Sequence, residues 1–517
     1  MTLIKERGTE TGIEDWRSFK FENEIEICWV KEEYLIRRVQ FDPIDLFRTT
    51  FNDFTKLEIL SLKKYEIPKL GSNTFENLKR LKKLFLFENQ ISEIDPNVFH
   101  GMERLEELDL TGNKLVKIAP KTFQHLSGLK LLTLTLNQIS EIEPDAFLGQ
   151  ENLEDLILIR NKFTKLTSNS FRHLKSLTLL NLYENQISEI EPNAFEGLDS
   201  LEDIHLNKNK FTKLEPNWFH HLPKLKLLKL CHNQINQIAP NAFQGLESLT
   251  KLDLESNELP LIETNMFQHL NNLNKLIMRY NPIKTIEPNG FQGLENLEIA
   301  DFYRGRLTRI ETNMLQHLDK LKELSFCNNL IETIEPNSFQ NKEDLEKLDL
   351  QINEFKIIER NSFQHLKNLK DLRLTKNKIS YIEANGFRGL ESLERLDIDC
   401  NELYVLNFYS FEHLWKLRIL DLGSNIIVYI DTTCFNGLDN LETIKFFRNY
   451  LTELEFKTFE SMKNLKHLDL AYNRINKIDL EGFQVLEHFE EIILSGNDLY
   501  KREPKFFKCL TRTKVTF

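Results

Sequence analysis

Apolar residues recur along the chain at a fixed spacing. Sliding the sequence against itself gives a period of 24 residues, seen clearly in residues 105–126, LEELDLTGNKLVKIAPKTFQHL. The pattern is LxxLxLxxNxLxxLxPxxFxxLxx, and nineteen such units, here called rungs, run from Leu57 to Arg512 without an insertion or deletion. Positions in a rung are numbered from its first Leu. Repetition at this period predicts a stack of identical short units, since one rung cannot bury its own apolar face.

The first half of each rung predicts a short parallel strand. In LxxLxLxxN, apolar positions 4 and 6 alternate with polar ones, as in a strand with one buried face. Position 9 is Asn in 17 of the 19 rungs, Tyr65 and Gly305 being the exceptions. We expect this side chain to turn the chain and to bond backbone groups of neighbouring rungs in a ladder. The ladder residues include Asn89, Asn113, Asn137, Asn161 and Asn185.

The second half of each rung predicts a helical turn over an aromatic core. Position 19 is Phe in 18 of the 19 rungs, with Leu315 as the exception, and we expect these rings to fill the interior. Position 15 is Asp or Glu in 14 rungs, and position 16 is Pro in 9. An acidic residue followed by Pro is typical of the start of a helix. We therefore expect a short helical turn on the outer side of every rung.

This pattern resembles the leucine-rich repeat family, in its 24-residue typical subtype. The resemblance implies an α/β solenoid, a horseshoe with a concave parallel sheet and short helical turns on the convex side. We assign residues 1–35 to an N-terminal cap region with a strand-like segment at 19–30. Residues 36–517 form the solenoid: a shortened rung that opens with 36–41, the 19 uniform rungs (57–512) and an incomplete C-terminal rung. An open last rung would expose core and a strand edge, so we expect further sequence or a partner to cover it.

A second period, of 48 residues, lies on top of the first. Position 21 is His in every second rung from 125 to 413, and most of the alternate rungs carry Gly there. Position 2 tends to alternate basic and acidic residues, as in Lys82, Glu106, Lys130 and Glu154. Because neighbouring parallel strands lie about 4.8 Å apart, this alternation predicts opposite charges side by side across the sheet. We interpret the period as growth by duplication of a two-rung unit.

Composition narrows the classes of function. The 517 residues are 41% hydrophobic, enough for a core, and carry a net charge of −12 without a basic run, which argues against nucleic acid as a partner. The 14 carboxylates of position 15 alone exceed this surplus, so the acidity belongs mostly to the scaffold, the alternative being a stripe that recruits cations or a basic partner. No apolar run reaches the roughly 18 to 20 residues of a membrane span, and no signal peptide is visible at the start.

No arrangement of residues predicts catalysis, a metal site or a cofactor. The chain has no GxSxG, HExxH, phosphate-binding loop or GxGxxG motif. The recurrent His lie two rungs apart, roughly 10 Å or more, which is too far to share a zinc ion. The six Cys include no CxxC pair, so we expect free thiols rather than disulfides or a zinc site. We therefore expect a protein that is not an enzyme.

We expect a ligand on the concave face, which positions 3, 5, 7 and 8 line and where members of the resembled family generally bind protein partners. In mid-array these positions include Ile277 and the sequence pairs Arg279-Tyr280 and Tyr303-Arg304 on adjacent rungs. Arg279 should lie beside Tyr303 and Tyr280 beside Arg304, a checkerboard with cation–π contacts. The alternative is that these side chains merely satisfy one another. Two further groups are Lys445, Phe447, Arg448 and Tyr472, and Ile157, Ile159 and Tyr183.

Two functions fit the sequence. The first is a non-catalytic module that recognises a protein ligand in immunity, adhesion or signalling, because the pattern resembles extracellular arrays such as insect leucine-rich immune proteins and Toll-like receptor ectodomains. That resemblance implies a secreted or cell-surface location. The alternative is a cytoplasmic scaffold or regulatory subunit of an enzyme complex, which the free thiols and the lack of Cys-rich caps favour. The ligand and the oligomeric state do not follow from the sequence.

Overall fold

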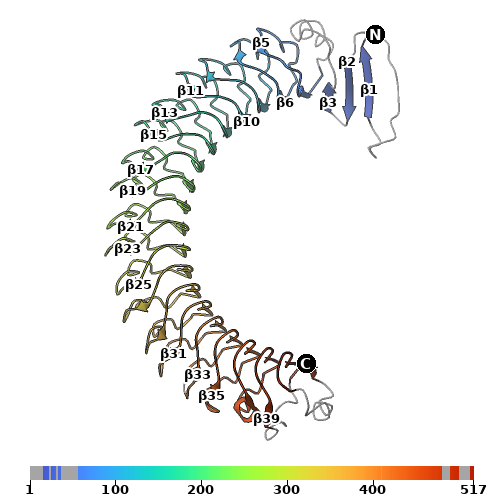
Figure 1. Ribbon diagram of the computed structural model, residues 1–517. Helices are drawn as coiled ribbons and strands as arrows, with labels where there is room; N and C mark the ends of the chain where they lie inside the picture. The colour runs from blue at the N-terminus through green and yellow to red at the C-terminus, as the bar shows by residue number, and fades with distance from the viewer. Residues whose placement is uncertain are drawn as a thin grey trace. The chain divides into compact units, whose positions relative to one another are not determined.

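The computed structural model describes residues 16–21, 25–30, 33–36, 56–408, 410–479, 489–499 and 513–516. It consists of two compact units, Met1–Leu254 and Glu255–Phe517. Both units are solenoids of 24-residue rungs. In each, the longer strands line the inner edge of the coil and the shorter strands line its outer edge (Figure 1). The division into a cap and a single array, with boundaries at 35 and 36, stays a prediction.

The first unit has one long sheet and four strand pairs on the outer edge. The strands of the long sheet are β1 (Trp16–Phe21), β2 (Ile25–Val30), β3 (Glu33–Ile36), β4 (Ile59–Ser61), β6 (Lys83–Phe85), β8 (Glu107–Asp109), β10 (Leu131–Thr133), β12 (Asp155–Ile157), β14 (Leu179–Asn181), β16 (Asp203–His205), β18 (Leu227–Lys229) and β20 (Lys251–Asp253). The outer pairs are β5 (Lys69–Leu70) with β7 (Glu93–Ile94), β9 (Lys117–Ile118) with β11 (Glu141–Ile142), β13 (Lys165–Leu166) with β15 (Glu189–Ile190), and β17 (Lys213–Leu214) with β19 (Gln237–Ile238).

The second unit repeats this arrangement. Its long sheet contains β22 (Lys275–Ile277), β24 (Ile299–Asp301), β26 (Glu323–Ser325), β28 (Lys347–Asp349), β30 (Asp371–Arg373), β32 (Arg395–Asp397), β34 (Ile419–Asp421), β36 (Thr443–Lys445), β38 (His467–Asp469), β40 (Glu491–Ile493) and β41 (Lys514–Thr516). The outer pairs are β21 (Leu261–Ile262) with β23 (Thr285–Ile286), β25 (Arg309–Ile310) with β27 (Thr333–Ile334), β29 (Ile357–Ile358) with β31 (Tyr381–Ile382), β33 (Val405–Leu406) with β35 (Tyr429–Ile430), and β37 (Glu453–Glu455) with β39 (Lys477–Asp479).

The rungs stack in register. From β4 to β20, and again from β22 to β40, each strand pairs in parallel with the equivalent residues 24 places later, as Leu132 does with Leu156. At the start, β1 and β2 form an antiparallel hairpin, and β3 joins β2 to β4, pairing Tyr34 with Leu60. For the shortened rung predicted to open with residues 36–41, the structure describes only Ile36. This residue ends β3 (Glu33–Ile36), the parallel strand before the first uniform rung, and residues 37–41 lie outside the described residues. At the end, β41 pairs Lys514 with Glu491, a spacing of 23.

The apolar positions form one continuous core within each unit. In rung 105–128, Leu105, Leu108, Leu110, Phe123 and Leu126 are at most 1% exposed. The position-19 rings stack on one another from Phe75 to Phe219, with centroids 6.1–6.5 Å apart. A second stack runs from Phe339 to Phe459 with centroids 5.8–6.4 Å apart. Each buried ring or Leu contributes about 1.5–3 kcal/mol of transfer free energy, so repetition supplies the stability.

The position-9 Asn side chains bind backbone groups of their own rung and the preceding one. Asn113 Nδ2 donates to Leu86 O and Leu110 O, both at 2.9 Å, and its Oδ1 accepts from Ile91 N at 3.1 Å. The same three bonds recur at the other ladder residues named from the sequence, Asn89 excepted, whose Oδ1 accepts from Tyr65 N. These Asn are buried, so each satisfies polar atoms that would otherwise be left without partners.

The expected helical turn on every rung was wrong. Over the residues that the structure describes, the outer segments contain no α-helix, and the helical structure is one 3-10 helix, η2 (Phe456–Phe459). Glu-Pro-Asn forms a reverse turn instead. In residues 287–290, Gly290 N donates to Glu287 O at 2.9 Å, and Asn289 has a φ of 62°. A left-handed residue directly after Pro is typical of a type II turn, and it ends helical geometry.

The position-15 carboxylates take part in the scaffold. Glu287 Oε2 accepts from Thr264 N at 2.9 Å, and Glu335 Oε2 accepts from Thr312 N at 3.0 Å, each one rung back. On the inner edge, position 2 forms the expected pairs of opposite charge across the sheet, such as Lys82 with Glu58 at 2.8 Å. Further pairs are Lys130–Glu154, Lys226–Glu202, Lys322–Glu298, Lys370–Glu346, Arg418–Glu442 and Lys466–Glu490. Many charged surface side chains therefore form ion pairs between neighbouring rungs.

The 48-residue period has a structural basis. Within a two-rung unit, the outer strands pair, and the position-21 Gly of the second rung lies directly on the backbone of the first, Gly437 excepted. A Cβ on Gly293 would lie 2.6 Å from Gln268 Cα. Between two-rung units, the position-21 His binds the side chain at position 17 of the preceding rung, as His365 Nε2 does to Asn337 Oδ1 at 3.1 Å. Further examples are His173–Asp145, His221–Asn193, His317–Asn289 and His413–Asn385. The two kinds of rung interface are therefore built differently.

Candidate ligand-binding face

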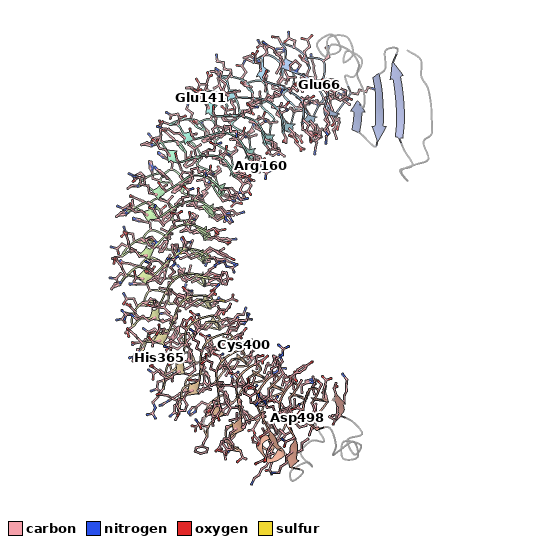
Figure 2. All side chains as sticks on the ribbon, viewed as in Figure 1. Glu66, Glu141, Arg160, His365, Cys400 and Asp498 are labelled. Atoms are coloured by element: carbon pink, nitrogen blue, oxygen red, sulfur yellow. The ribbon has the colours of Figure 1, made fainter. Side chains whose placement is uncertain are left out.

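The inner edge of each unit presents positions 3 and 5 from the strands and positions 7 and 8 from the turn that follows. Positions 4 and 6 point into the core, so most of the longer strands show a half-buried, buried, half-buried pattern. Figure 2 shows Arg160 and Cys400, both at position 8, on the inner edge of their units, and Glu141 and His365 on the outer edge. A ligand on the inner edge would therefore meet these four positions.

Position 8 has a backbone conformation that the sequence pattern did not reveal. All nineteen residues there have φ between 52° and 75°, in the left-handed region, although only Gly112 and Gly496 are glycines. Such a φ is uncommon outside Gly, Asn and Asp. The residue types at position 8 are too varied to signal this turn. As a result, the side chains at position 8 leave the edge of the sheet in the same way on every rung.

Position 5 is largely structural where it carries Asp, Asn or Ser. Asp301 Oδ1 accepts from Tyr303 N at 3.1 Å, and Asp109 Oδ1 accepts from Thr111 N at 2.8 Å. This contact caps the turn two residues later, as Asp and Asn commonly do. An acidic residue at position 5 is therefore a poor guide to ligand binding, and positions 7 and 8 carry more information.

The central patch consists of Arg279, Tyr280, Tyr303 and Arg304, in the second unit. The Arg304 guanidinium carbon lies 5.3 Å from the centre of the Tyr280 ring, the cation–π contact expected from the sequence. The rings of Tyr280 and Tyr303 meet edge to face, with centroids 5.3 Å apart. Tyr280 is 40% exposed. The patch therefore holds two tyrosines and a guanidinium in fixed mutual orientation.

Arg279 does not take the partner expected for it. Its Nε donates to Asp301 Oδ2 at 2.5 Å, and the structure records no stack of Arg279 on Tyr303 among the described residues. Sequence reasoning missed Asp301 because it paired only equal positions on adjacent rungs, whereas this contact joins position 7 to position 5. Ile277 is half-buried in β22 and lies opposite Asp301 in the parallel pairing. Of the two Arg–Tyr contacts expected in the checkerboard, the described residues therefore show only that of Arg304 with Tyr280.

The core beneath the central patch is built from different residues than elsewhere. Position 4 is Ala300 instead of Leu, and position 6 is Phe302, whose ring lies 5.7 Å from Phe291 and 5.4 Å from Phe326. The larger residue at position 6 restores volume lost at Ala300 and Leu315. Gly305 replaces the ladder Asn, and a Cβ there would collide with Asn329 Oδ1. The irregular rung is therefore compactly packed.

A hollow of about 310 Å³ adjoins the patch on the inner face of β24, β26, β28 and β30. Opposite charges line it in pairs. Lys347 Nζ lies 2.6 Å from Glu323 Oε1, and Arg373 Nη2 lies 2.9 Å from Asp371 Oδ2. At its floor, burial raises the pKa of Asp349. Since the charges along the hollow are largely paired, Arg304 beside it, which forms no ion pair among the described residues, is the more available cation.

The second predicted group is brought together only in part. Arg448 lies over the Tyr472 ring at 5.8 Å, and Phe447 covers the backbone of Gly423. Lys445 points elsewhere, with its Nζ 2.9 Å from Asp421 Oδ2.

The third predicted group belongs to the first unit. Ile157 and Ile159 are half-buried, and Tyr183 carries a cation–π contact from Lys208 at 5.1 Å. This cation was not anticipated from the sequence. The contact resembles the Arg304–Tyr280 pair but lacks the second tyrosine.

The described His, Cys, Asp and Glu side chains form neither a metal site nor a disulfide. Among the described residues, no three His, Cys, Asp or Glu side chains are grouped to hold a metal ion. The four Cys whose side chains are described, Cys231, Cys327, Cys400 and Cys434, are free thiols. Burial raises the pKa of Cys327 to about 12, so this thiol is unreactive. No helix in the described part of the chain is long and apolar enough to cross a membrane.

Comparisons with known proteins identify the repeat. The family model described as "Leucine rich repeat" matches residues 55–115, 103–163, 151–211, 200–259, 252–299, 304–355, 343–403, 391–451 and 440–499. These segments omit residues 300–303, which lie in the irregular rung. A search of curated proteins finds no significant match.

Solved structures share the fold at low sequence identity. The Toll–Spatzle complex of Drosophila, described as a hub in development and innate immunity, matches with a TM-score of 0.73 and 17% identity over 93% of this chain and 68% of that one. The TLR13–ssRNA13 complex matches with a TM-score of 0.55 and 21% identity over 94% of this chain and 95% of that one.

Proposed function

The chain belongs to the leucine-rich repeat family, and on this premise we propose that it is a non-catalytic recognition module that binds a protein ligand on the inner face of its second unit. The central patch is its main contact. One observation carries this proposal: Arg304, Tyr280 and Tyr303 form a fixed cluster on a rung that departs from the repeat. Tyr and Arg are enriched among the residues that dominate the energetics of protein interfaces, and Tyr buries a large area with few rotatable bonds.

The surroundings support the same surface. Arg279 is held by Asp301, and the hollow beside the patch is lined by paired charges, so a ligand would meet a largely pre-ordered face. Pre-ordering lowers the entropy lost on binding. The Toll structure, which shares this fold, is a complex with the protein Spatzle. A protein ligand would also fit the central patch.

Variants at the two tyrosines test the proposal. The wild-type chain, immobilised on beads, is used to capture proteins from native tissue, and the captured protein is then titrated against purified variants. We expect Tyr280→Ala with Tyr303→Ala to weaken its affinity at least tenfold, because two aromatic contacts are lost. Tyr381→Ala, at an exposed tyrosine on the outer edge of the same unit, is the control and should leave affinity unchanged. Equal affinity of the tyrosine double variant and the wild type would refute the central patch.

We propose an extracellular or cell-surface location for this recognition, because the repeat pattern resembles extracellular arrays and the fold is shared with the Toll and TLR13 structures. The free thiols favour the alternative, a cytoplasmic scaffold, because long-lived secreted proteins usually pair their cysteines. Fractionation of native cells distinguishes the two, and retention of the full-length protein in the cytosol would favour the scaffold.

A further inference from the structure

A second cluster of arginines and tyrosines lies near the C-terminal end of the second unit. Here called the C-terminal platform, it consists of Phe447, Arg448, Tyr450, Tyr472 and Arg474. The Arg448 guanidinium carbon lies 5.8 Å from the Tyr472 ring centre, and that of Arg474 lies 4.3 Å from the Tyr450 ring centre. In the first stack the arginine belongs to the earlier rung, and in the second to the later rung. The platform thus extends from the inner face around the turn.

The two stacks flank a rigid support. Positions 8 and 10 carry them, and position 9 between them is the ladder residue, Asn449 on one rung and Asn473 on the next. Asn473 Nδ2 donates to Phe446 O at 2.9 Å and to Leu470 O at 3.0 Å, and it is 6% exposed. The outward residues are more open, Tyr472 at 61% and Tyr450 at 41%. The exposed side chains of Tyr450 and Tyr472 therefore project from a backbone that the ladder hydrogen bonds hold in place.

Glycines make room for the aromatic rings. Phe447 occupies space above Gly423 of the preceding rung, where any Cβ would collide with the ring. Tyr472 lies against Gly496 of the following rung, and a Cβ there would be 2.7 Å from Tyr472 Cδ1. Position 7 carries Gly in rung 417 alone among the nineteen rungs. This residue choice lets the Phe447 ring pack against Gly423 and so helps to position the platform.

The platform carries cations without carboxylate partners. Among the side chains that the structure describes, Arg448 and Arg474 form no ion pair, whereas nearby Lys445 and Lys477 bind Asp421 and Glu453. Asp498, at position 10 of the following rung, is exposed. Among the described side chains, no ion pair joins it to Arg474. A guanidinium stacked on a tyrosine keeps its N–H edge free to bind a carboxylate in a bidentate manner.

We propose that the C-terminal platform docks an extended acidic segment of a protein partner, a contact separate from the central patch that rests on the proposed recognition function. Two carboxylates of the segment bind Arg448 and Arg474, and an apolar residue of the segment packs on Phe447 and Ile426, which is 36% exposed. A protein segment fits better than single-stranded nucleic acid, because a guanidinium already covers one face of each tyrosine and closes it to base stacking.

The test uses defined probes on the full chain. Fluorescence anisotropy measures binding of a fluorescein-labelled peptide that alternates Glu and Leu, a matched Lys and Leu peptide, and a labelled oligouridine. We expect saturable binding of the acidic peptide only. Arg448→Ala with Arg474→Ala should weaken it at least tenfold, and Arg448→Lys with Arg474→Lys should also weaken it, because a point charge cannot replace a planar bidentate donor.

Two further variants separate this proposal from the proposed function. Gly423→Ala displaces Phe447 without altering a contact atom and should weaken the acidic peptide several-fold, with an unchanged thermal midpoint showing that the fold persists. Arg304→Ala, in the central patch, should leave peptide affinity unchanged. The proposal is overturned if the peptide fails to bind, if the Arg448 and Arg474 variants bind as well as wild type, if Arg304→Ala abolishes binding, or if oligouridine binds more tightly and is lost in the same variants.

Discussion

Lys342 Nζ lies 3.7 Å from Asp319 Oδ1 inside the second unit, at position 22, where most rungs carry Leu. The Lys342 side chain is 1% exposed, and its other recorded contact is a 3.3 Å hydrogen bond to Asn341 O. One long ion pair and one weak hydrogen bond leave a buried ammonium poorly compensated.

Replacing this lysine should stabilise the protein. We expect Lys342→Met, an unbranched side chain one heavy atom shorter, to raise the free energy of unfolding by about 1–3 kcal/mol, because it removes a desolvated charge from an apolar site. Denaturant unfolding of the two proteins measures the change. Lys320→Met, at an exposed lysine of the preceding rung, is the control and should leave the denaturation midpoint where it is. A lower midpoint for Lys342→Met would show that the ion pair is net stabilising.

The same residue predicts a pH dependence. Burial lowers the pKa of Lys342 from its ordinary value of 10.5. In the window between the lowered pKa and 10.5, the unfolded chain binds more protons than the folded chain, so stability rises with pH. We expect the stability gap between Lys342→Met and wild type to narrow as the pH approaches 10.5. A gap that stays constant between pH 7 and 10 would contradict the lowered pKa.

The packing next to two position-21 glycines predicts unequal effects of one substitution. Gly389 has a φ of 98°, and a Cβ there would collide with the backbone of Gln364. Gly437 has a similar φ of 89°, but the nearest atom to its Cβ would be Trp415 Cδ1 at 3.7 Å. Gly437→Ala should therefore lose only about 1–2 kcal/mol from backbone strain, and Gly389→Ala should lose more. Thermal unfolding of the two variants measures these losses of stability. Equal losses would show that the rungs move apart and so relieve the collision of the added methyl group in Gly389→Ala.

The irregular rung predicts coupling between two core positions. Phe302→Leu restores the usual residue at position 6 but should cost about 1–3 kcal/mol, because Ala300 leaves its volume unfilled. Ala300→Leu alone should overpack the site. Both changes together restore the common pattern and should lose less than the sum of the single losses, which a double-mutant cycle measures. Additive losses would show that Phe302 and Ala300 do not compensate each other.

The repeat made much of the fold predictable. The alternation at positions 4 and 6 placed the strands, and the recurrence of Asn and Phe indicated the ladder and the aromatic stack, because each residue type does one physical task on every rung. Glu-Pro-Asn misled, since an acidic residue before Pro is typical both of helix starts and of turns. The left-handed φ at position 17, as at Asn289, decides for the turn.

The site was less predictable, because some of its contacts depart from the pairing of equal positions on the strand face. The stack of Arg304 on Tyr280 joins equal positions on adjacent rungs and could be expected. The pairing of Arg279 with Asp301 joins unequal positions, and the stack of Arg474 on Tyr450 lies at position 10, outside the strand face that the family pattern highlights. Side-chain length and direction decide these contacts, and periodicity alone does not encode them.

Photocrosslinking tests most directly whether the central patch faces the ligand. Benzoylphenylalanine placed at Tyr303 should join covalently to the captured protein partner on irradiation, because this side chain lies within the proposed interface. The same group at Tyr381, which is 45% exposed on the outer edge of the same unit, should give no crosslink. A crosslink from position 381 with none from 303 would contradict recognition by the inner face.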